Sequence, residues 1–174
     1  MNLRKLPIFH LESIRASFSI HKNPVMQNTD SVGALLRDKT SVLHSITTTA
    51  TVLDAIRMMA EKNIGAVPVL QQGKLVGMFS ERDYTRKVVL MGRTSKDTFV
   101  GEIMTRNPET VTLASTVNEC MEIMTEQRVR HLPVIENGEI VGILSIGDLV
   151  KWIISAQTAT IEHLTRYVFG EPVV

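Results

Sequence analysis

The stretch VGMFSERD at Val76–Asp83 returns as VGILSIGD at Val141–Asp148. In each copy an apolar run with strand character ends at a serine, and an aspartate follows three residues later. The two copies are 65 residues apart, as Asp83 and Asp148 are. At this offset eight further residues meet an identical residue in the second copy: Thr47, Thr51, Val52, Met59, Glu61, Pro68, Val69 and Gly73. A period longer than the ~20–50 residues of solenoid repeats indicates a duplicated fold unit.

Hydrophobic periodicity and turn residues predict the same order of elements, about β-α-β-β-α, in both copies. After a short helix over Val32–Arg37, the first copy has a strand over Val42–Thr47, a helix from Thr51, strands over Ala66–Leu70 and Lys74–Phe79, and a helix over Ser80–Val89. After a short helix over Glu102–Met104, the second has a strand over Pro108–Thr112, a helix from Thr116, strands over Leu132–Ile135 and Glu139–Leu144, and a helix from Ser145 to about Ser155. A last helix is predicted over Thr160–Val168.

The domain organisation follows from this duplication. We expect a tail over residues 1–29, a first repeat over 30–92, a linker over 93–101, a second repeat over 102–156 and a C-terminal helix over 157–174. One unit of ~50 residues is too small to bury an adequate core by itself. The sequence therefore predicts a mixed α/β fold in which two repeats pack sheet to sheet about an approximate two-fold axis.

Composition excludes several classes of function. The 174 residues are 44% hydrophobic, and 19 basic against 18 acidic residues give a net charge of +1, so no global field attracts nucleic acid or an anionic membrane. No apolar run approaches the ~20 residues of a membrane span, which favours a soluble protein. The single Cys120 can form neither an internal disulfide nor a cysteine cluster for zinc.

The first 29 residues are basic, with Arg4, Lys5, Arg15 and Lys22 against only Glu12. A surface tail of a cytoplasmic protein is our first interpretation of this segment. A presequence for the mitochondrial matrix is the alternative, because such presequences are basic and poor in acidic residues.

Two interpretations apply to the Ser-x-x-Asp pairs, Ser80 with Asp83 and Ser145 with Asp148. Each pair has the form of a capping box, as do Thr51-x-x-Asp54 and Thr116-x-x-Glu119 in the same chain. Each also follows a buried strand at its carboxyl end, where α/β folds place ligands and where a carboxylate can accept from both hydroxyls of a ribose. We expect a ribose contact for at least one of the two aspartates.

The motifs GAVPV…GKLVGMFSERD in the first copy and RHLPV…GEIVGILSIGD in the second resemble those of a CBS-domain pair, or Bateman module. The resemblance covers about residues 30–156, and small stand-alone CBS-pair proteins of bacteria and plant organelles are most similar. It implies a non-catalytic regulatory module that binds AMP, ADP, ATP, NAD(H) or S-adenosylmethionine in the cleft between its repeats. It also implies pairing of two modules into a disc-like homodimer.

The resemblance implies ligand contacts at further positions. Thr47 and Thr112 would contact base or ribose, although either could be only a β-branched strand residue. Backbone groups of Ala66, Val67, Pro68 and Pro133 could bind an adenine edge. Cations that differ between the copies, among them Arg82, Arg130 and His131, could converge on phosphate, or could belong to a solvated surface.

We therefore expect a sensor of adenine nucleotides that acts on an unidentified protein in trans, with one stronger and one weaker site. A structural homodimeric adaptor with degenerate pockets is the alternative. No nucleophile–base pair and no phosphate-binding Gly-x-x-x-x-Gly-Lys loop is present, so an enzyme is not expected.

Overall fold

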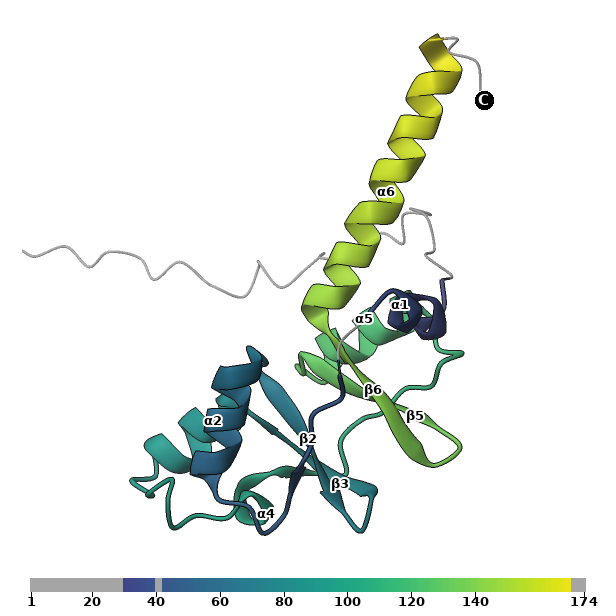
Figure 1. Ribbon diagram of the computed structural model, residues 1–174. Coiled ribbons are helices and arrows are strands. Elements are labelled where there is room, and N and C mark those ends of the chain that lie inside the picture. Colours follow the sequence, from purple (N-terminus) through teal and green to yellow (C-terminus); the bar gives the residue numbers. More distant parts are fainter. Residues whose placement is uncertain (1–29, 40–41, 170–174) are drawn as a thin grey trace, which may run out of the picture.

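The computed structural model describes residues 30–39 and 42–169, and the predicted tail over residues 1–29 lies outside this part of the chain. Two lobes lie side by side, and a long helix leaves the second of them (Figure 1). The elements in chain order are α1 (Val32–Asp38), β1 (Ile46–Thr47), α2 (Val52–Lys62), β2 (Ala66–Gln71), β3 (Lys74–Ser80), α3 (Glu81–Tyr84), the π-helical segment η2 (Thr85–Val89), α4 (Val100–Ile103), β4 (Thr105–Arg106), α5 (Val117–Glu126), β5 (His131–Glu136), β6 (Glu139–Ser145) and α6 (Ile146–Phe169). The mixed α/β class and the duplicated units are confirmed.

Both central helices begin at the predicted capping residues. Thr51 Oγ1 accepts from the Asp54 backbone N–H at 3.1 Å, and Thr116 with Glu119 forms a reciprocal capping box at the start of α5. Asn63 ends α2 in the left-handed conformation, with φ of 52°. Such caps satisfy backbone groups that a helix end leaves without partners.

The two hairpins pair their strands in the same register, so residues 65 positions apart in the sequence occupy equivalent places in the two repeats. Val67 pairs with Phe79 in β2–β3, and Leu132 pairs with Leu144 in β5–β6. All four side chains are fully buried. β1 and β4 flank the first hairpin in a four-stranded sheet of order β1-β2-β3-β4, whereas the second sheet contains β5 and β6 alone. β3 lies against β6, so the two sheets adjoin.

The short helix that precedes each repeat packs into the hydrophobic core of the other repeat. Val32 and Leu35 of α1 are buried in the second core, whereas Val100 and Ile103 of α4 are buried in the first. Backbone hydrogen bonds connect the same segments. Val52 N donates to the Thr98 carbonyl at 2.9 Å, and Val117 N donates to the Asp30 carbonyl at 3.0 Å. The repeats are therefore interlocked.

Three details differ from the sequence-based prediction. α6 is one helix of 24 residues where two helices were expected, because no glycine or proline interrupts positions 148–169. The entry strands are shorter than predicted: β1 contains two residues, and only Val111 of the second segment bridges to Val134. β4 was not predicted, and it pairs with β3 beside Gly77, where the absence of a side chain admits the neighbouring segment. Within the described ranges, no helix has both the length and the apolar character needed to cross a bilayer.

Candidate functional site

The first Ser-x-x-Asp pair is a complete capping box at the end of β3. Ser80 Oγ accepts from Asp83 N at 3.2 Å, while Asp83 Oδ2 accepts from Ser80 N at 3.1 Å and from Ser80 Oγ at 2.6 Å. The capping interpretation is thus correct. It does not exclude a ligand, because a carboxylate has about four lone-pair positions and the box occupies only Oδ2.

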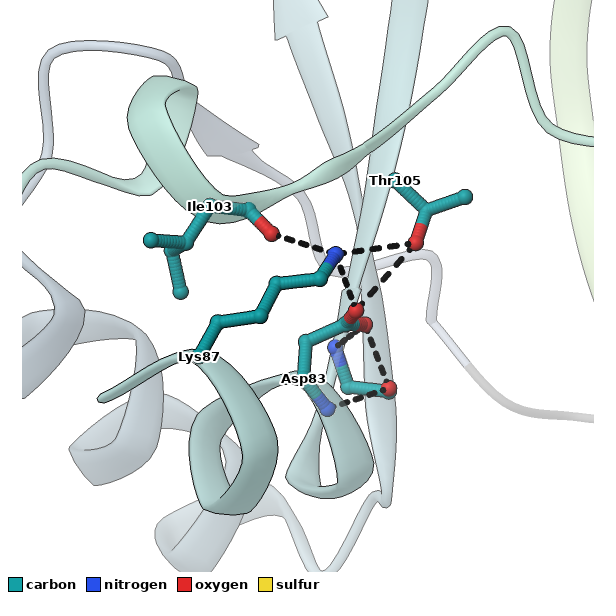
Figure 2. A network of polar contacts seen from close by, with 5 residues as sticks. Asp83, Lys87, Ile103 and Thr105 are labelled. Carbon is teal, nitrogen blue, oxygen red and sulfur yellow. Dashed lines mark hydrogen bonds and ion pairs between the residues drawn. The ribbon is translucent and has the colours of Figure 1, made fainter. Parts of the chain in front are cut away.

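The other oxygen of Asp83 is the centre of a polar network (Figure 2). Asp83 Oδ1 forms an ion pair with Lys87 Nζ at 2.6 Å and accepts from Thr105 Oγ1 at 3.2 Å. Lys87 Nζ also donates to the Ile103 carbonyl at 2.8 Å. The network joins the first repeat's carboxylate to the segment that leads into the second repeat.

The second Ser-x-x-Asp pair repeats the box but has a different cation. Asp148 Oδ2 accepts from Ser145 N at 2.7 Å and from Ser145 Oγ at 2.6 Å. Lys39, from the segment after α1, donates to the same oxygen at 2.8 Å and to the Ile143 carbonyl at 2.9 Å. Burial by itself would raise the pKa of Asp148, but the hydrogen bonds from Lys39 and Ser145 and the charge of Lys39 outweigh it and lower the pKa.

Replacing Lys39 with methionine is expected to flatten the acid limb of the stability–pH profile. The folded-state pKa of Asp148 lies below its unfolded value, so its stabilisation is complete above the unfolded value of about 3.9 and is lost as pH falls through the folded value. Urea unfolding at several pH values between about 5 and 2 measures the slope. Lys74→Met, at an exposed position at the start of β3, is the control. Identical slopes for Lys39→Met and the parent would contradict this account of Asp148.

A cleft of about 1070 Å³ lies between the repeats and is lined by residues of both. It contains six of the predicted contact residues: Ala66, Ser80, Arg82, Asp83, Arg130 and His131. Arg86, Lys87 and Arg128 also line it, so cations from both repeats surround one hollow. Arg82 Nη1 donates to the Arg128 carbonyl at 2.8 Å and so bridges the repeats directly.

The remaining predicted residues lie outside this cleft, as follows: Thr47, Val67, Pro68, Thr112, Pro133, Ser145 and Asp148. Thr47 Oγ1 shares a hydrogen bond with Thr49, and Thr112 N donates to Ser115 Oγ. The Pro133 carbonyl accepts from Val111 N at 3.0 Å, which occupies one of its two lone pairs. The cleft therefore combines the aspartate of the first repeat with Arg130 and His131 of the second, and the other seven predicted residues lie outside it.

His131 is a neutral member of the cleft. Burial lowers the pKa of its imidazole, as do the charges of Lys39 and Arg130, whereas Asp148 acts in the opposite direction. The imidazole ring lies close to Gly65, because a Cβ atom added at Gly65 would be 3.6 Å from His131 Cε1. At neutral pH the side chain is therefore a hydrogen-bonding group rather than the cation that the sequence suggested.

Two residues with direct contacts to the aspartates, Thr105 and Lys39, were not predicted. Lys39 and Asp148 are 109 positions apart and meet only because α1 packs on the second repeat. Lys87 carried a usable signal, because a lysine four residues after an aspartate lies on the same helix face.

Comparison with known proteins agrees with this architecture. The CBS-domain family matches residues 32–90 and 100–155. The mitochondrial CBS domain-containing protein CBSX3 of Arabidopsis thaliana is 40% identical over 129 residues, which cover 71% of this chain and 63% of that protein. The match thus spans less than two thirds of the relative's length.

Two solved structures are also similar. A CBS-domain protein from Burkholderia ambifaria MC40-6 has 45% identity and a TM-score of 0.70, with 73% of this chain and 96% of that chain covered. CBSX2, solved in complex with AMP, has 28% identity and a TM-score of 0.57 over 66% of this chain and 90% of its own. The repeats, the paired Ser-x-x-Asp boxes and these matches lead to one conclusion: the chain belongs to the CBS-domain family.

Proposed function

We propose that this chain is a non-catalytic sensor that binds an adenine nucleotide in the cleft between its repeats and signals to a partner protein in trans. The observation that carries the proposal is the lining of the cleft, which includes the Asp83 carboxylate of the first repeat and Arg128 and Arg130 of the second. A ribose diol can donate to Asp83 Oδ1, and arginine side chains suit phosphate because their planar fork binds it bidentately. The AMP complex of CBSX2 supports this class of ligand.

The network at Asp83 suggests how occupancy is transmitted. A ribose hydroxyl at Oδ1 competes with Thr105 and Lys87, which hold the segment between the repeats. A ligand changes conformation only through such differential contacts in two states. We infer that binding weakens the tie between Asp83 and Thr105 and so alters the packing of one repeat on the other.

A thermal-shift screen separates the sensor from a structural adaptor, which is the second candidate function. AMP, ADP, ATP and NADH are added singly, and a ligand at a hundredfold excess over its Kd stabilises the folded state by ~2.7 kcal/mol. The sensor predicts a clear rise in Tm for at least one of them. No shift with any nucleotide, at concentrations up to the millimolar range, supports the adaptor instead.

The two potential nucleotide sites, one at Asp83 and one at Asp148, are expected to differ in affinity. Asp83 opens on the described cleft, whereas Asp148 lies outside it and is paired with Lys39. Calorimetric titration is therefore expected to give one strong site per chain and a second that is weak or absent. Two ligands bound with equal affinity would contradict this inequality.

Assembly and location are further parts of the proposal. The family resemblance supports pairing of two modules into a homodimer. The name of the Arabidopsis relative places that protein in mitochondria and supports a mitochondrial location, the alternative to the cytoplasm, for this chain. In this interpretation the basic residues 1–29 act as a presequence.

A further inference from the structure

His131 is the only histidine among the residues that line the described cleft. Histidine is also the one type of side chain in that lining whose charge ordinarily changes between about pH 5 and 8. The other charged residues of the lining are arginine, lysine, aspartate and glutamate. If the cleft responds to pH in this range, His131 is therefore the group that carries the response.

The imidazole nitrogens of His131 are open to the cleft. Within residues 30–39 and 42–169, no hydrogen bond joins them to another residue, and no fully buried side-chain nitrogen or oxygen is left without a partner. The two ring nitrogens are therefore accessible where the residue lines the cleft. A neutral imidazole has one donor and one acceptor, whereas the protonated ring has two donors. The ring can thus bind a ligand in either state of charge.

The surroundings of His131 keep the ring neutral in the free protein. Burial is the largest effect and disfavours the charged imidazole, and the charges of Lys39 and Arg130 act in the same direction. Asp148 of α6 acts in the opposite direction, but the pKa of His131 still lies below its ordinary value of 6.5. A further negative charge beside the ring is needed before it is protonated at neutral pH.

The first repeat also contributes a charge near the ring, the Glu81 carboxylate of α3. A Cβ atom added at Gly65 would be 3.5 Å from Glu81 Oε2 and 3.8 Å from His131 Nε2, so both groups lie beside the same point. Glu81 is exposed, and solvent weakens the effect of its charge on the ring. Arg82 and Arg128 line the same cleft and add positive charge. The cleft therefore lacks the anion that would protonate His131.

A nucleotide phosphate supplies that anion. A phosphate group carries a charge of about −1.5 to −2 at pH 7. An opposite charge within ~4–6 Å raises the proton affinity of a base about tenfold or more. The protonated imidazole then donates a charge-assisted hydrogen bond to the phosphate. The effect is reciprocal, because a proton that favours phosphate binding is itself favoured by the bound phosphate.

We propose that His131 takes up a proton when a nucleotide phosphate enters the cleft, so that the chain binds its nucleotide more tightly as pH falls. The inference rests on the proposed function and adds a response to pH to it. The pKa of His131 is higher in the complex than in the free protein. The affinity gained from the proton is therefore complete below the free-state pKa, and it is lost as pH rises through the pKa of the complex.

Proton NMR of the imidazole Cε1–H measures the charge of His131 directly and needs only the parent protein. The signal is identified by its nuclear Overhauser contact with the Hα atoms of Gly65, which lies close to Cε1. Without ligand, the pKa of His131 is expected below 6.5, and with saturating AMP it is expected to rise above this value. A pKa of His131 that bound AMP leaves unchanged overturns the inference.

Calorimetric titration with AMP between about pH 6 and 8 measures the consequence for affinity. His131→Gln keeps a neutral hydrogen-bonding group, and His163→Gln, exposed on α6 and outside the cleft, is the matched control. As pH rises over this range, the parent and the control are expected to lose about fivefold more affinity than His131→Gln. The phosphate of AMP itself titrates near pH ~6, but this effect is common to all three proteins and cancels in the comparison.

The outcomes separate this inference from the proposed function. An equal pH dependence in the parent and in His131→Gln overturns the role of His131 and leaves the nucleotide site in place. A parent that binds no AMP at any pH in the range contradicts the proposed function, and the inference with it.

Discussion

Replacing Asp83 with alanine is expected to lower the affinity for AMP about 10- to 150-fold. Hydrogen bonds to a charged group contribute ~1.5–3 kcal/mol, and each ~1.4 kcal/mol corresponds to a tenfold change in Kd. The carboxylate lines the cleft, and its Oδ1 already accepts from a hydroxyl, that of Thr105. Asp148→Ala is expected to have a smaller effect, because Asp148 lies outside the cleft. Isothermal titration calorimetry with AMP gives both values.

Two further variants separate ligand binding from helix capping. Asp83→Asn retains an acceptor for the Ser80 capping box but loses the charge, so it should remain folded and still bind AMP weakly. Asp54→Ala removes the equivalent capping carboxylate of α2, at an exposed position outside the cleft, and should bind AMP like the parent. Parental affinity in a folded Asp83→Ala protein would show that the ribose contact has been placed wrongly.

Gly77→Ala is expected to destabilise the fold by ~1–3 kcal/mol, as overpacking of a well-filled core does. An added Cβ would lie 2.5 Å from Met104 Sδ and 2.9 Å from the Thr105 carbonyl oxygen. The backbone oxygen cannot move without disturbing the pairing of β3 with β4, in which Met78 faces Thr105. Urea unfolding measures the loss in free energy of unfolding.

Gly142→Ala, the same position in the second repeat, is the matched control. The atoms nearest to its Cβ would belong to the Leu36 side chain, with Cδ1 at 3.1 Å, and this flexible side chain can turn aside. We expect a cost below about 1 kcal/mol for this variant. Equal losses at Gly77 and Gly142 would mean that the β4 segment yields as easily as a leucine side chain.

The parts of the fold that depend on neighbouring residues could be predicted from the sequence. Ser80 and Asp83 are three residues apart, so their capping box follows from local pattern alone, and the turn at Gln72 and Gly73 does too. The 65-residue repeat then transferred each prediction to the second unit. Family resemblance supplied the cleft between the repeats, which the structure contains.

The parts that depend on exchange between the repeats could not be predicted. Nothing in the sequence around Val32 indicates that α1 packs in the second core, and the contact of Lys39 with Asp148 follows from that packing. The same exchange brings Thr105 to Asp83. The predicted gap between a helix that ends near Ser155 and another that begins at Thr160 was wrong, since α6 continues through it. Long-range packing decided the contacts of α1, Lys39 and Thr105, whereas α6 continues because no glycine or proline interrupts it.

The proposed nucleotide site is one cleft that two interlocked repeats form together. Asp83 comes from the first repeat and Arg130 with His131 from the second, so neither repeat alone has the complete set. In the proposed function, the duplication therefore supplies the binding site as well as a sufficient core.

A crystal structure of the chain grown with AMP tests this account most directly. It is expected to show the nucleotide between the repeats, with a ribose hydroxyl within hydrogen-bond distance, ~2.6–3.0 Å, of Asp83 Oδ1. The phosphate is expected beside arginines of the cleft. A nucleotide bound elsewhere on the chain, or an empty cleft at saturating AMP with the Asp83–Lys87–Thr105 network unchanged, would contradict it.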